Sequence, residues 1–554
     1  MEASDVIIIG GGAAGCVMAA RLSETTSRTV TLIEAGRDVL PDATPDDITD
    51  IFPRSYANMN YFWPSLTASI GAGQTPRPYS QARVMGGGGN VMGLWALRGL
   101  ADDYDGWAAA GAKGWSHADV LPYFKKLERD LDFPGAPHGR DGPIPIKRTM
   151  KADWPLYNKV LADAAERTQL PYRPDLNATD EDGVFPTPIS TDGRRRFASA
   201  NGYLTSAVRR RANLRILAET EVERLVLEGR RVVGVEARKT GGERALLKAP
   251  IVVVTAGALH TPALLLRSGV GPATELKALG IEPVLDQPAV GENLQNHTFV
   301  HLAAFIRPEA RQPKTMRNFT MTCVRFSSRV DGAPASDLLI SFAARTSGQP
   351  AGNRIGLVSA HLYAPFSKGK VSLQRQNGGL APCVDFRMLS DSRDQSRMVR
   401  SAGFARGLLD EPAVREVTQD AFILPAQTPI RTLNGPGLKS VALGAAVAVM
   451  AALPAGLRRA ALQSQIGAGR FLDGMDNTRF AELVLASAIP MFHPAGTCAL
   501  GSVLDPQTRV KGIDGLFVAD ASAMPSVPRA NTNIPTIMVA EKSAAAIDDI
   551  LLRS

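Results

Sequence analysis

Histidine is scarce in this chain, with seven in 554 residues, and one of them lies in a setting that suits proton transfer. His493 occurs in "MFHPAGTCALG" (491–501), between bulky Phe492 and a turn at Pro494–Gly496. Imidazole titrates near neutral pH, so a histidine within hydrogen-bond reach of a substrate is suited to act as a general base. Because a lone histidine is more often structural than catalytic, the surrounding elements have to decide its role.

The other six histidines occur in less suggestive contexts. His361 lies in a strand-like segment of the predicted substrate domain and is the second candidate for a base that lines a pocket. His117 and His138 lie in polar, loop-like contexts, and His260 is predicted to serve structural packing. His297 and His301 follow a turn where the chain is expected to cross between domains.

The N-terminal segment carries a dinucleotide-binding pattern. An apolar run, Val6–Ile9, has the size of a buried parallel strand, and Gly10, Gly12 and Gly15 follow in G-x-G-x-x-G spacing before a helical stretch. The three glycines allow a tight turn, close approach of a pyrophosphate and close helix–strand packing, while the helix N-terminus offers free N–H groups to the anion. Glu34 ends the next strand, where a carboxylate is placed to accept from a ribose hydroxyl.

Two later segments favour FAD over NAD. Residues 214–238 alternate like antiparallel strands with a turn at Gly229, and residues 249–271 read as a buried strand that leads through Gly257 into a helix. A cofactor domain that is interrupted by such a meander and returns to its sheet near residue 255 is usual for flavoproteins. We therefore predict a flavin cofactor.

Composition bounds the class of protein. A chain of 554 residues is too long for one hydrophobic core, so at least two domains are expected. The net charge of +8 comes from 62 basic and 54 acidic residues that are interspersed, so nucleic-acid binding is not expected. The four cysteines match neither a disulfide framework nor a zinc site, and no metal is expected.

The sequence predicts a cytoplasmic enzyme without stable membrane insertion. The N-terminus "MEASDVIIIGGG" has no basic region and no cleavage site, and it leads directly into a strand. The uncharged stretch 441–457 is marginally short for a membrane span and contains Pro454. We interpret it as a helix that is buried or lines the mouth of a pocket.

Five ordered motifs resemble those of the glucose–methanol–choline (GMC) oxidoreductases. They occupy residues 82–107, 257–271, 291–297, 493–501 and 516–547, and the resemblance runs nearly end to end. Further segments are similar to members that oxidise aromatic and furanic alcohols, namely "YFWPSLT", "VLPYFKKLERD", "GPIPI" and "RANTNIPTIMVAEK".

The resemblance implies an α/β fold, α+β overall, with a Rossmann-like FAD-binding domain and a substrate domain. The FAD-binding domain is expected to be discontinuous, at residues 1–155, 195–300 and 485–554. The substrate domain is expected at 156–194 and 301–484, with an antiparallel sheet covered by helices. Strands are predicted within 336–344, 354–365 and 369–374, and a helix within 392–409.

In relatives, a base and a second His or Asn flank the substrate hydroxyl. The resemblance assigns the base to His493 and the second position to Asn533, with Asn531 as the alternative in the same motif. Asp520, in "VADAS", is predicted to lie along the cofactor, and its alternative role is that of a plain helix cap. Leu362, Tyr363 and Phe492 are predicted to form pocket walls.

The flavin loop departs from the family pattern, because Gly88, Gly89, Asn90, Val91 and Met92 stand where relatives usually have paired serines and an asparagine. No His or Cys occupies this loop, so FAD is expected to be non-covalent. The full set of residues predicted to bind the cofactor is Gly10, Gly12, Ala13, Ala14, Gly15, Glu34, Ala35, Arg83, Met85, Gly87, Asn90, Val91, Met92, Gly93, Val222, Ala256, Asp520, Ala521, Asn533, Ile534 and Pro535.

The expected function is FAD-dependent oxidation of a primary alcohol, aromatic or furanic, to the aldehyde. The hydride goes to flavin N5, and O2 or another acceptor then takes the electrons. A choline-type or aliphatic alcohol dehydrogenase with a non-oxygen acceptor is the alternative, although 6% aromatics leave no evident cage for a quaternary ammonium. An FAD-containing hydroxynitrile lyase and a flavin-binding protein without activity are the alternatives from other classes.

Overall fold

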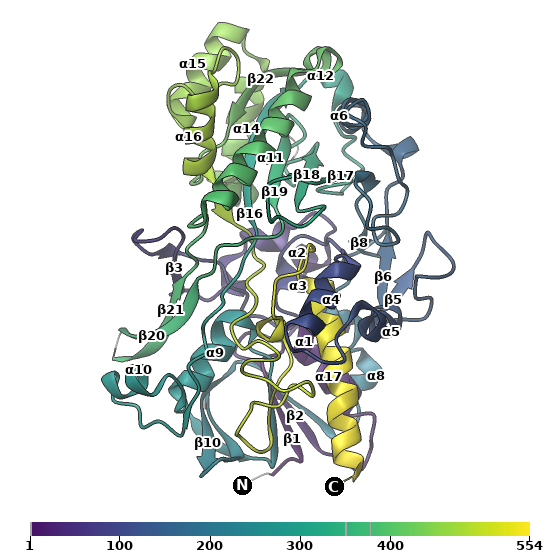
Figure 1. Ribbon diagram of the computed structural model, residues 1–554. Coiled ribbons are helices and arrows are strands. Elements are labelled where there is room, and N and C mark those ends of the chain that lie inside the picture. Colours follow the sequence, from purple (N-terminus) through teal and green to yellow (C-terminus); the bar gives the residue numbers. More distant parts are fainter. Residues whose placement is uncertain (1–2, 350–351, 377, 429, 436, 554) are drawn as a thin grey trace.

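The computed structural model describes residues 3–349, 352–376, 378–428, 430–435 and 437–553. Its lower half, in the view of Figure 1, is built on a five-stranded parallel sheet. The strands follow the order β24 (Leu516–Val518), β13 (Ile251–Val254), β1 (Val6–Ile9), β2 (Val30–Ile33) and β9 (Leu214–Leu217). β1, β2 and the last three residues of β13 are buried apolar runs, as expected for strands covered on both faces.

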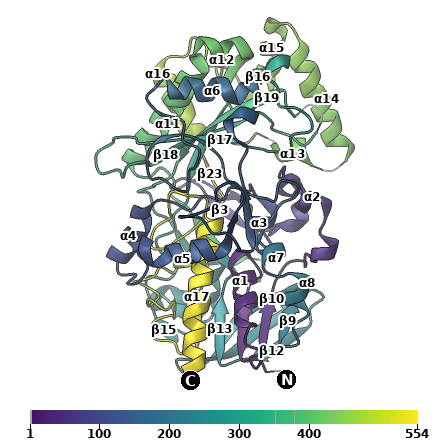
Figure 2. The ribbon, with the colours of Figure 1, turned by 90° about the vertical axis from the view of Figure 1, so that its right-hand side faces the viewer.

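Two helices from opposite ends of the sequence pack side by side next to this sheet. α1 (Ala13–Leu22) follows β1 directly, and α17 (Asn533–Arg553) closes the chain. A partly buried ion pair joins them, because Arg21 of α1 donates to Glu541 of α17. The two chain ends therefore lie at the same end of the molecule (Figures 1 and 2).

An antiparallel meander interrupts the parallel sheet, as the sequence predicts. It consists of β10 (Thr220–Glu228), β11 (Arg231–Lys239) and β12 (Arg244–Lys248). Gly229 turns between the first two strands with a φ of +58°, a conformation that favours glycine. The chain then returns to the parallel sheet through β13.

The other half of the molecule is an antiparallel sheet with helices on one face (Figure 2). α6 (Leu156–Glu166) and α11 (Ser392–Asp410) pack on that face. The strands alternate strictly: in β19, Val358, Ala360 and Leu362 belong to the core beneath the helices. The strand order is β22 (Thr418–Ile423), β16 (Thr298–Ile306), β19 (Ile355–Leu362), β18 (Leu338–Ala343), β17 (Thr322–Phe326) and β7 (Gly183–Pro186), with β23 (Ile489–Pro490) also paired to β16.

These sheets confirm the mixed α/β fold class, and they show where the chain crosses between its halves. β16 begins at Thr298, so the proposed boundary near residue 300 falls inside a strand of the antiparallel sheet. Strand β21 (Gly379–Asp385) pairs with β3 (Thr67–Ser69), so a segment assigned to the substrate domain is joined to one assigned to the cofactor domain. The predicted strand at 369–374 is β20 (Lys370–Gln376), which pairs with β21 and lies outside the main antiparallel sheet.

The uncharged stretch 441–457 is neither a buried helix nor part of a pocket mouth, contrary to our interpretation of the sequence. It spans most of α14 (Leu438–Ala452) and the start of α15 (Ala455–Ile466). Val441 and Val449 are more than half exposed, and only Ser440 and Gly444 of α14 are buried. No helix among the described residues is long and apolar enough to cross a membrane.

Candidate active site

A cavity of about 710 Å³ lies between the parallel sheet and the antiparallel sheet. Its cofactor side begins where β1 ends. Gly10 has a φ of +97°, and a Cβ on Gly15 would lie 1.8 Å from the Gly10 carbonyl oxygen, so both positions require glycine. A Cβ on Gly12 would meet nothing within 4 Å. Gly12 caps α1 without a side-chain hydrogen bond, so the N–H groups of the first turn face the cavity and suit an anion.

The Glu34 carboxylate stands at the end of β2 and lines the same cavity. Its Oε2 accepts the Gly11 N–H at 2.7 Å, and its Oε1 accepts the Gly36 N–H at 2.7 Å. Burial raises the pKa of Glu34, and the two backbone N–H donors oppose that rise. Each carboxylate oxygen has a second lone pair, so Glu34 still has capacity to accept from a ribose hydroxyl.

Asp520 lines the cavity beyond β24 and ties three segments together. One oxygen accepts the Gly257 N–H at 2.8 Å and the Thr261 hydroxyl at 2.6 Å, and the other accepts from Ser522. Gly257 is the first residue of α9 (Gly257–Arg267). Asp520 therefore combines the two roles that the sequence analysis treats as alternatives: it caps a helix and it lines the cavity.

The loop that differs from the family pattern forms a single helical turn, α3 (Gly88–Val91). Gly87, with a φ of +54°, brings the loop against Gly12, because a Cβ on Gly87 would lie 3.0 Å from the Gly12 Cα. Asn90 is buried and donates to the Met85 carbonyl at 2.7 Å, so its amide holds the loop closed and does not reach the cavity.

The structure divides the predicted cofactor residues into two groups. Those that line the cavity are Gly10, Gly12, Ala13, Ala14, Glu34, Ala35, Gly87, Met92, Gly93, Val222, Ala256, Asp520, Ala521 and Asn533. Those that do not line the cavity are Gly15, Arg83, Met85, Asn90, Val91, Ile534 and Pro535. Val91 and Ile534 are core residues, and Arg83 stacks its guanidinium on Trp63.

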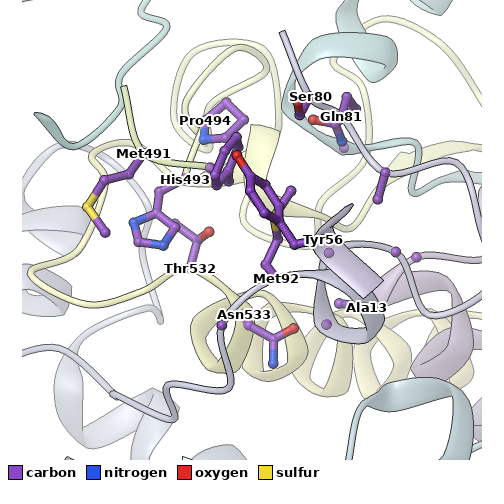
Figure 3. A pocket seen from close by; sticks show the side chains of 18 of the residues that line it. Ala13, Tyr56, Ser80, Gln81, Met92, Met491, His493, Pro494, Thr532 and Asn533 are labelled. Atoms are coloured by element: carbon purple, nitrogen blue, oxygen red, sulfur yellow. The ribbon is translucent and has the colours of Figure 1, made fainter. Parts of the chain in front are cut away.

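His493 follows β23 and lines the cavity opposite the start of α17 (Figure 3). Its backbone N–H donates to the Asn296 side chain at 3.2 Å, and its Nδ1 lies 2.9 Å from Nδ1 of His297. Burial lowers the pKa of His493 to about 3. The sequence analysis expects a base that titrates near neutrality, whereas the structure holds this imidazole neutral at all physiological pH values.

Asn533 and Asn531 both reach the cavity. Asn533 is the first residue of α17. A Cβ at position 89 would lie 3.1 Å from its Oδ1, which is a tight contact, so the glycine at this position leaves room for the Asn533 side chain. Asn531 accepts the Tyr363 O–H at 2.8 Å. Figure 3 shows Asn533 below Thr532 on the floor of the cavity, across from Tyr56.

Of the three residues predicted to form pocket walls, Phe492 lines the cavity and Leu362 and Tyr363 do not. Phe492 lines the cavity, together with Tyr56, whose ring centroid is 5.5 Å from that of Phe492. Leu362 does not line it: its neighbour His361 faces the cavity, so strand alternation turns Leu362 into the core under α11. Tyr363 is fully buried behind the cavity, stacked on His297 at 4.3 Å between ring centroids.

Histidines and arginines outside the predicted set of site residues also belong to this region, and His361, the second candidate for a base, lies there as well. His260, His301 and His361 line the cavity, and burial lowers the pKa of each. His297 contacts the predicted base directly, and Arg431 lines the cavity beside Tyr56. The motif "GENLQNH" is the sequence signal that could have drawn attention to His297.

Comparison with known proteins decides the family. The family model described as GMC oxidoreductase matches residues 4–299 with its N-terminal part and residues 365–540 with its C-terminal part.

The chain is a GMC oxidoreductase. It is 37% identical over 566 residues to 5-(hydroxymethyl)furfural oxidase of Methylovorus sp. (strain MP688), with 98% of both chains covered. It is 31% identical to an oxygen-dependent choline dehydrogenase of Brucella anthropi, covering 100% of this chain and 96% of the relative. Pyridoxine 4-oxidase from Mesorbium loti superposes with a TM-score of 0.79 at 26% identity over 99% of both chains.

FAD is the cofactor of this GMC oxidoreductase, and the residues present fit it. The open cradle at Gly12 and the uncapped start of α1 suit its pyrophosphate, and the spare lone pairs of Glu34 suit a ribose. The N-terminus of α17, at Asn533, faces the same cavity and presents a second set of free N–H groups to negative charge.

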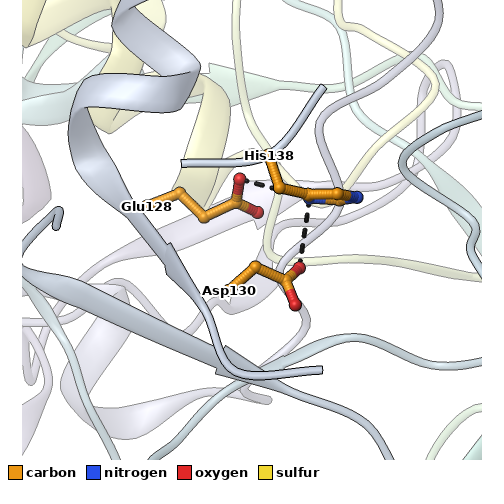
Figure 4. Close-up of side chains that lie close together, drawn as sticks. All are labelled: Glu128, Asp130 and His138. Carbon is orange, nitrogen blue, oxygen red and sulfur yellow. Dashed lines mark hydrogen bonds and ion pairs between the residues drawn. The ribbon is translucent and has the colours of Figure 1, made fainter. Parts of the chain in front are cut away.

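A second buried cluster of titratable groups lies away from this cavity. His138 places its Nδ1 3.1 Å from Asp130 and 3.4 Å from Glu128, an arrangement whose ligand atoms are close enough to hold a metal ion (Figure 4). However, Arg98 pairs with Glu128, and Arg148 pairs with Asp130 at 2.8 Å. The cluster is therefore an ion-pair network in which guanidinium groups already occupy the carboxylates.

Proposed function

We propose that this GMC oxidoreductase oxidises a primary alcohol of the aromatic or furanic class to its aldehyde, with His493 as the base. The observation that carries the proposal is a buried, neutral imidazole that lines the cofactor cavity across from the start of α17. FAD, when bound, supplies the acceptor for the hydride that leaves the alcohol carbon.

The pairing with His297 supports a proton-accepting His493. For Nε2 to carry a free lone pair, the ring proton has to sit on Nδ1, from which it donates to Nδ1 of His297. When Nε2 takes the hydroxyl proton, the Nδ1–H bond to His297 remains and becomes charge-assisted, which stabilises the imidazolium. His297 is itself held neutral, because burial and the neighbouring His493 lower its pKa.

Asn533 is proposed to orient the substrate. Its amide lines the cavity at the first residue of α17, and an amide N–H is a suitable donor to the alcohol oxygen while His493 accepts the proton. Asn531 is the alternative, since its Oδ1 is occupied by the Tyr363 hydroxyl and its NH2 group is left for the cavity. We also propose that FAD is held without a covalent bond, because the loop of α3 contains neither His nor Cys.

The cavity disfavours the choline-type alternative. A quaternary ammonium group needs an aromatic cage with a nearby carboxylate. The carboxylates in the described cavity lining are Glu34, Glu221 and Asp520, and these lie against the parallel sheet and the meander on the cofactor side. The charged side chain near Tyr56 and Phe492 is instead a cation, Arg431.

An anaerobic flavin-reduction screen tests the proposal. Purified holoenzyme is mixed with benzyl alcohol, 5-(hydroxymethyl)furfural, choline and 1-propanol, and bleaching of the flavin is followed. We expect rapid bleaching with the first two alcohols, and a loss of about 10²–10⁴-fold in His493→Ala. Bleaching by choline alone, or a His493→Ala variant as fast as wild type, would contradict the proposal.

A further inference from the structure

Arg431 is the feature of the cavity that the reaction chemistry leaves unexplained. It lies on the short helix α13 (Ile430–Asn434) and lines the cavity beside Tyr56. Its guanidinium carbon sits 4.1 Å from the ring centroid of Tyr56 and 4.6 Å from that of Phe62. The two rings hold the guanidinium plane in place by cation–π contact.

No anionic partner is found for this cation among the described residues. Arg431 forms no ion pair there, and its Nε and Nη2 atoms are buried without a hydrogen-bond partner. Its Nη1 donates to the thioether sulfur of Met59 at 3.3 Å, which is a weak acceptor. Buried guanidinium donors without acceptors are costly, so the site is incomplete without an acceptor from elsewhere.

The titratable groups His301, His361 and Tyr56 of the described cavity lining carry no compensating negative charge. His301 and His361 line the cavity as neutral imidazoles, because burial lowers the pKa of each. Tyr56 stays a neutral phenol, since burial raises its pKa. An anion that reaches Arg431 therefore meets a positive charge with free N–H donors in surroundings of low polarity, where a charge-assisted hydrogen bond is strong.

The position of Arg431 relative to the base sets the shape of the ligand. Tyr56, against which Arg431 stacks, packs on Phe492, and Phe492 precedes His493 in the chain. A single aromatic ring placed along Phe492 and Tyr56 would present one end to His493 and the other toward Arg431. We propose that Arg431 forms a carboxylate subsite, and that the preferred substrates are aromatic or furanic alcohols that carry a carboxylate across the ring from the hydroxymethyl group.

This inference rests on the proposed function, because it names the substrate class of the same cavity. The test compares 4-(hydroxymethyl)benzoate with its neutral methyl ester, using anaerobic flavin reduction by holoenzyme. Wild type is expected to show the higher kcat/KM for the carboxylate. Arg431→Gln is expected to lower kcat/KM for the carboxylate by about 10–100-fold through KM, and to leave the ester within about twofold.

Lys439→Gln is the matched control variant. Lys439 is exposed near the start of α14 and does not line the cavity, so this change removes one positive charge nearby without touching the subsite. It is expected to leave both substrates unchanged. A preference of wild type for the ester, or an equal effect of Arg431→Gln and Lys439→Gln on the carboxylate, would overturn the inference.

A binding measurement separates failure of the subsite from failure of the reaction. Benzoate is titrated into holoenzyme, and the visible spectrum of the bound flavin reports its occupancy of the cavity. Binding by wild type that weakens at least tenfold in Arg431→Gln supports the subsite even if no alcohol bleaches the flavin. Binding that is the same in both proteins, or absent in wild type, counts against the subsite whatever the outcome of the alcohol screen.

Discussion

Nδ1 of His493 lies 2.9 Å from Nδ1 of His297, so the predicted base is held by a second buried histidine 196 residues earlier in the chain. Backbone pairing brings the two together: β23 pairs with β16, and the Met491 N–H donates to the His297 carbonyl at 2.9 Å. The rings meet edge to face, with an interplanar angle of 85°. Since Nδ1 of His493 is engaged in this contact, Nε2 is the nitrogen left for the substrate.

His297→Phe is expected to slow flavin reduction by about tenfold, because it removes the acceptor for the His493 Nδ1–H and leaves that donor buried. His297→Asn is expected to recover most of the rate, since its amide oxygen can occupy the place of Nδ1. Stopped-flow reduction gives the limiting rate, and flavin content checks that both variants bind FAD. Equal rates in the two variants would show that the contact only fills space.

The limiting rate of flavin reduction is expected to be independent of pH between about 5 and 9. Burial lowers the pKa of His493 to about 3, so the imidazole is already the proton-accepting form over this window. The rate falls only as the pH approaches that pKa from above. Measuring the reduction rate at half-unit pH steps decides the point: a rate that climbs through an ionisation near pH 7 contradicts the depressed pKa.

Local motifs are the part of the site that the sequence predicts well. The turn at Gly10–Gly15, the carboxylate of Glu34 and the carboxylate of Asp520 lie where the pattern places them, because each depends on one strand and the residues that follow it. The contact of His493 with His297 depends on strands far apart in the sequence. No local pattern encodes that register, so the sequence alone does not connect His297 with His493.

The second limit of prediction from the sequence is the direction in which the two faces of a strand point. The alternation in β19 is visible in the sequence, yet it does not say which face meets the cavity. Leu362 is predicted to form a pocket wall, whereas the residue of β19 that lines the cavity is its neighbour His361. Asn90 shows the same limit for loops: it is predicted to bind the cofactor, but its amide donates to the Met85 carbonyl within the loop and does not line the cavity.

Glu34→Ala is expected to weaken FAD binding without changing the reduction rate once FAD is saturating. A charged acceptor for hydrogen bonds contributes roughly 1.5–3 kcal/mol, or about 10–150-fold in the dissociation constant. The variant also leaves the Gly11 and Gly36 N–H groups without their acceptor, which loosens the loop. Titration of apoprotein with FAD gives the affinity, and an unchanged dissociation constant would remove Glu34 from the site.

Acid precipitation of the holoenzyme is expected to release intact FAD into the supernatant. The expectation rests on the loop of α3, which offers no nucleophilic side chain to the flavin. The thiol of Cys16 is also unreactive, because burial raises its pKa to about 12. Chromatography of the supernatant and absorbance of the pellet measure the partition. Flavin absorbance that stays with the precipitated polypeptide would indicate a covalent link.

The ion-pair network around His138 is expected to make stability depend on pH. Asp175, 2.5 Å from His138, and Glu128 raise the pKa of the imidazole to about 9 against the burial that lowers it. The folded state therefore binds a proton that the unfolded chain releases above about pH 6.5. The stabilisation is fully present below pH 6.5 and is lost as the pH rises through about 9.

Thermal unfolding of holoenzyme at pH 6, 7.5 and 9.5 measures this loss. The apparent Tm of wild type is expected to fall across the series, by about 1 °C for each kcal/mol of protonation energy lost in a chain of 554 residues. His138→Gln is expected to have the lower Tm at pH 6 and a smaller fall, so that the gap narrows by pH 9.5. His117→Gln, a partly exposed histidine at the start of α5 (His117–Leu127), is the control and is expected to follow wild type. A gap between wild type and His138→Gln that stays constant over the series would mean that His138 stabilises the fold by packing and not by its charge.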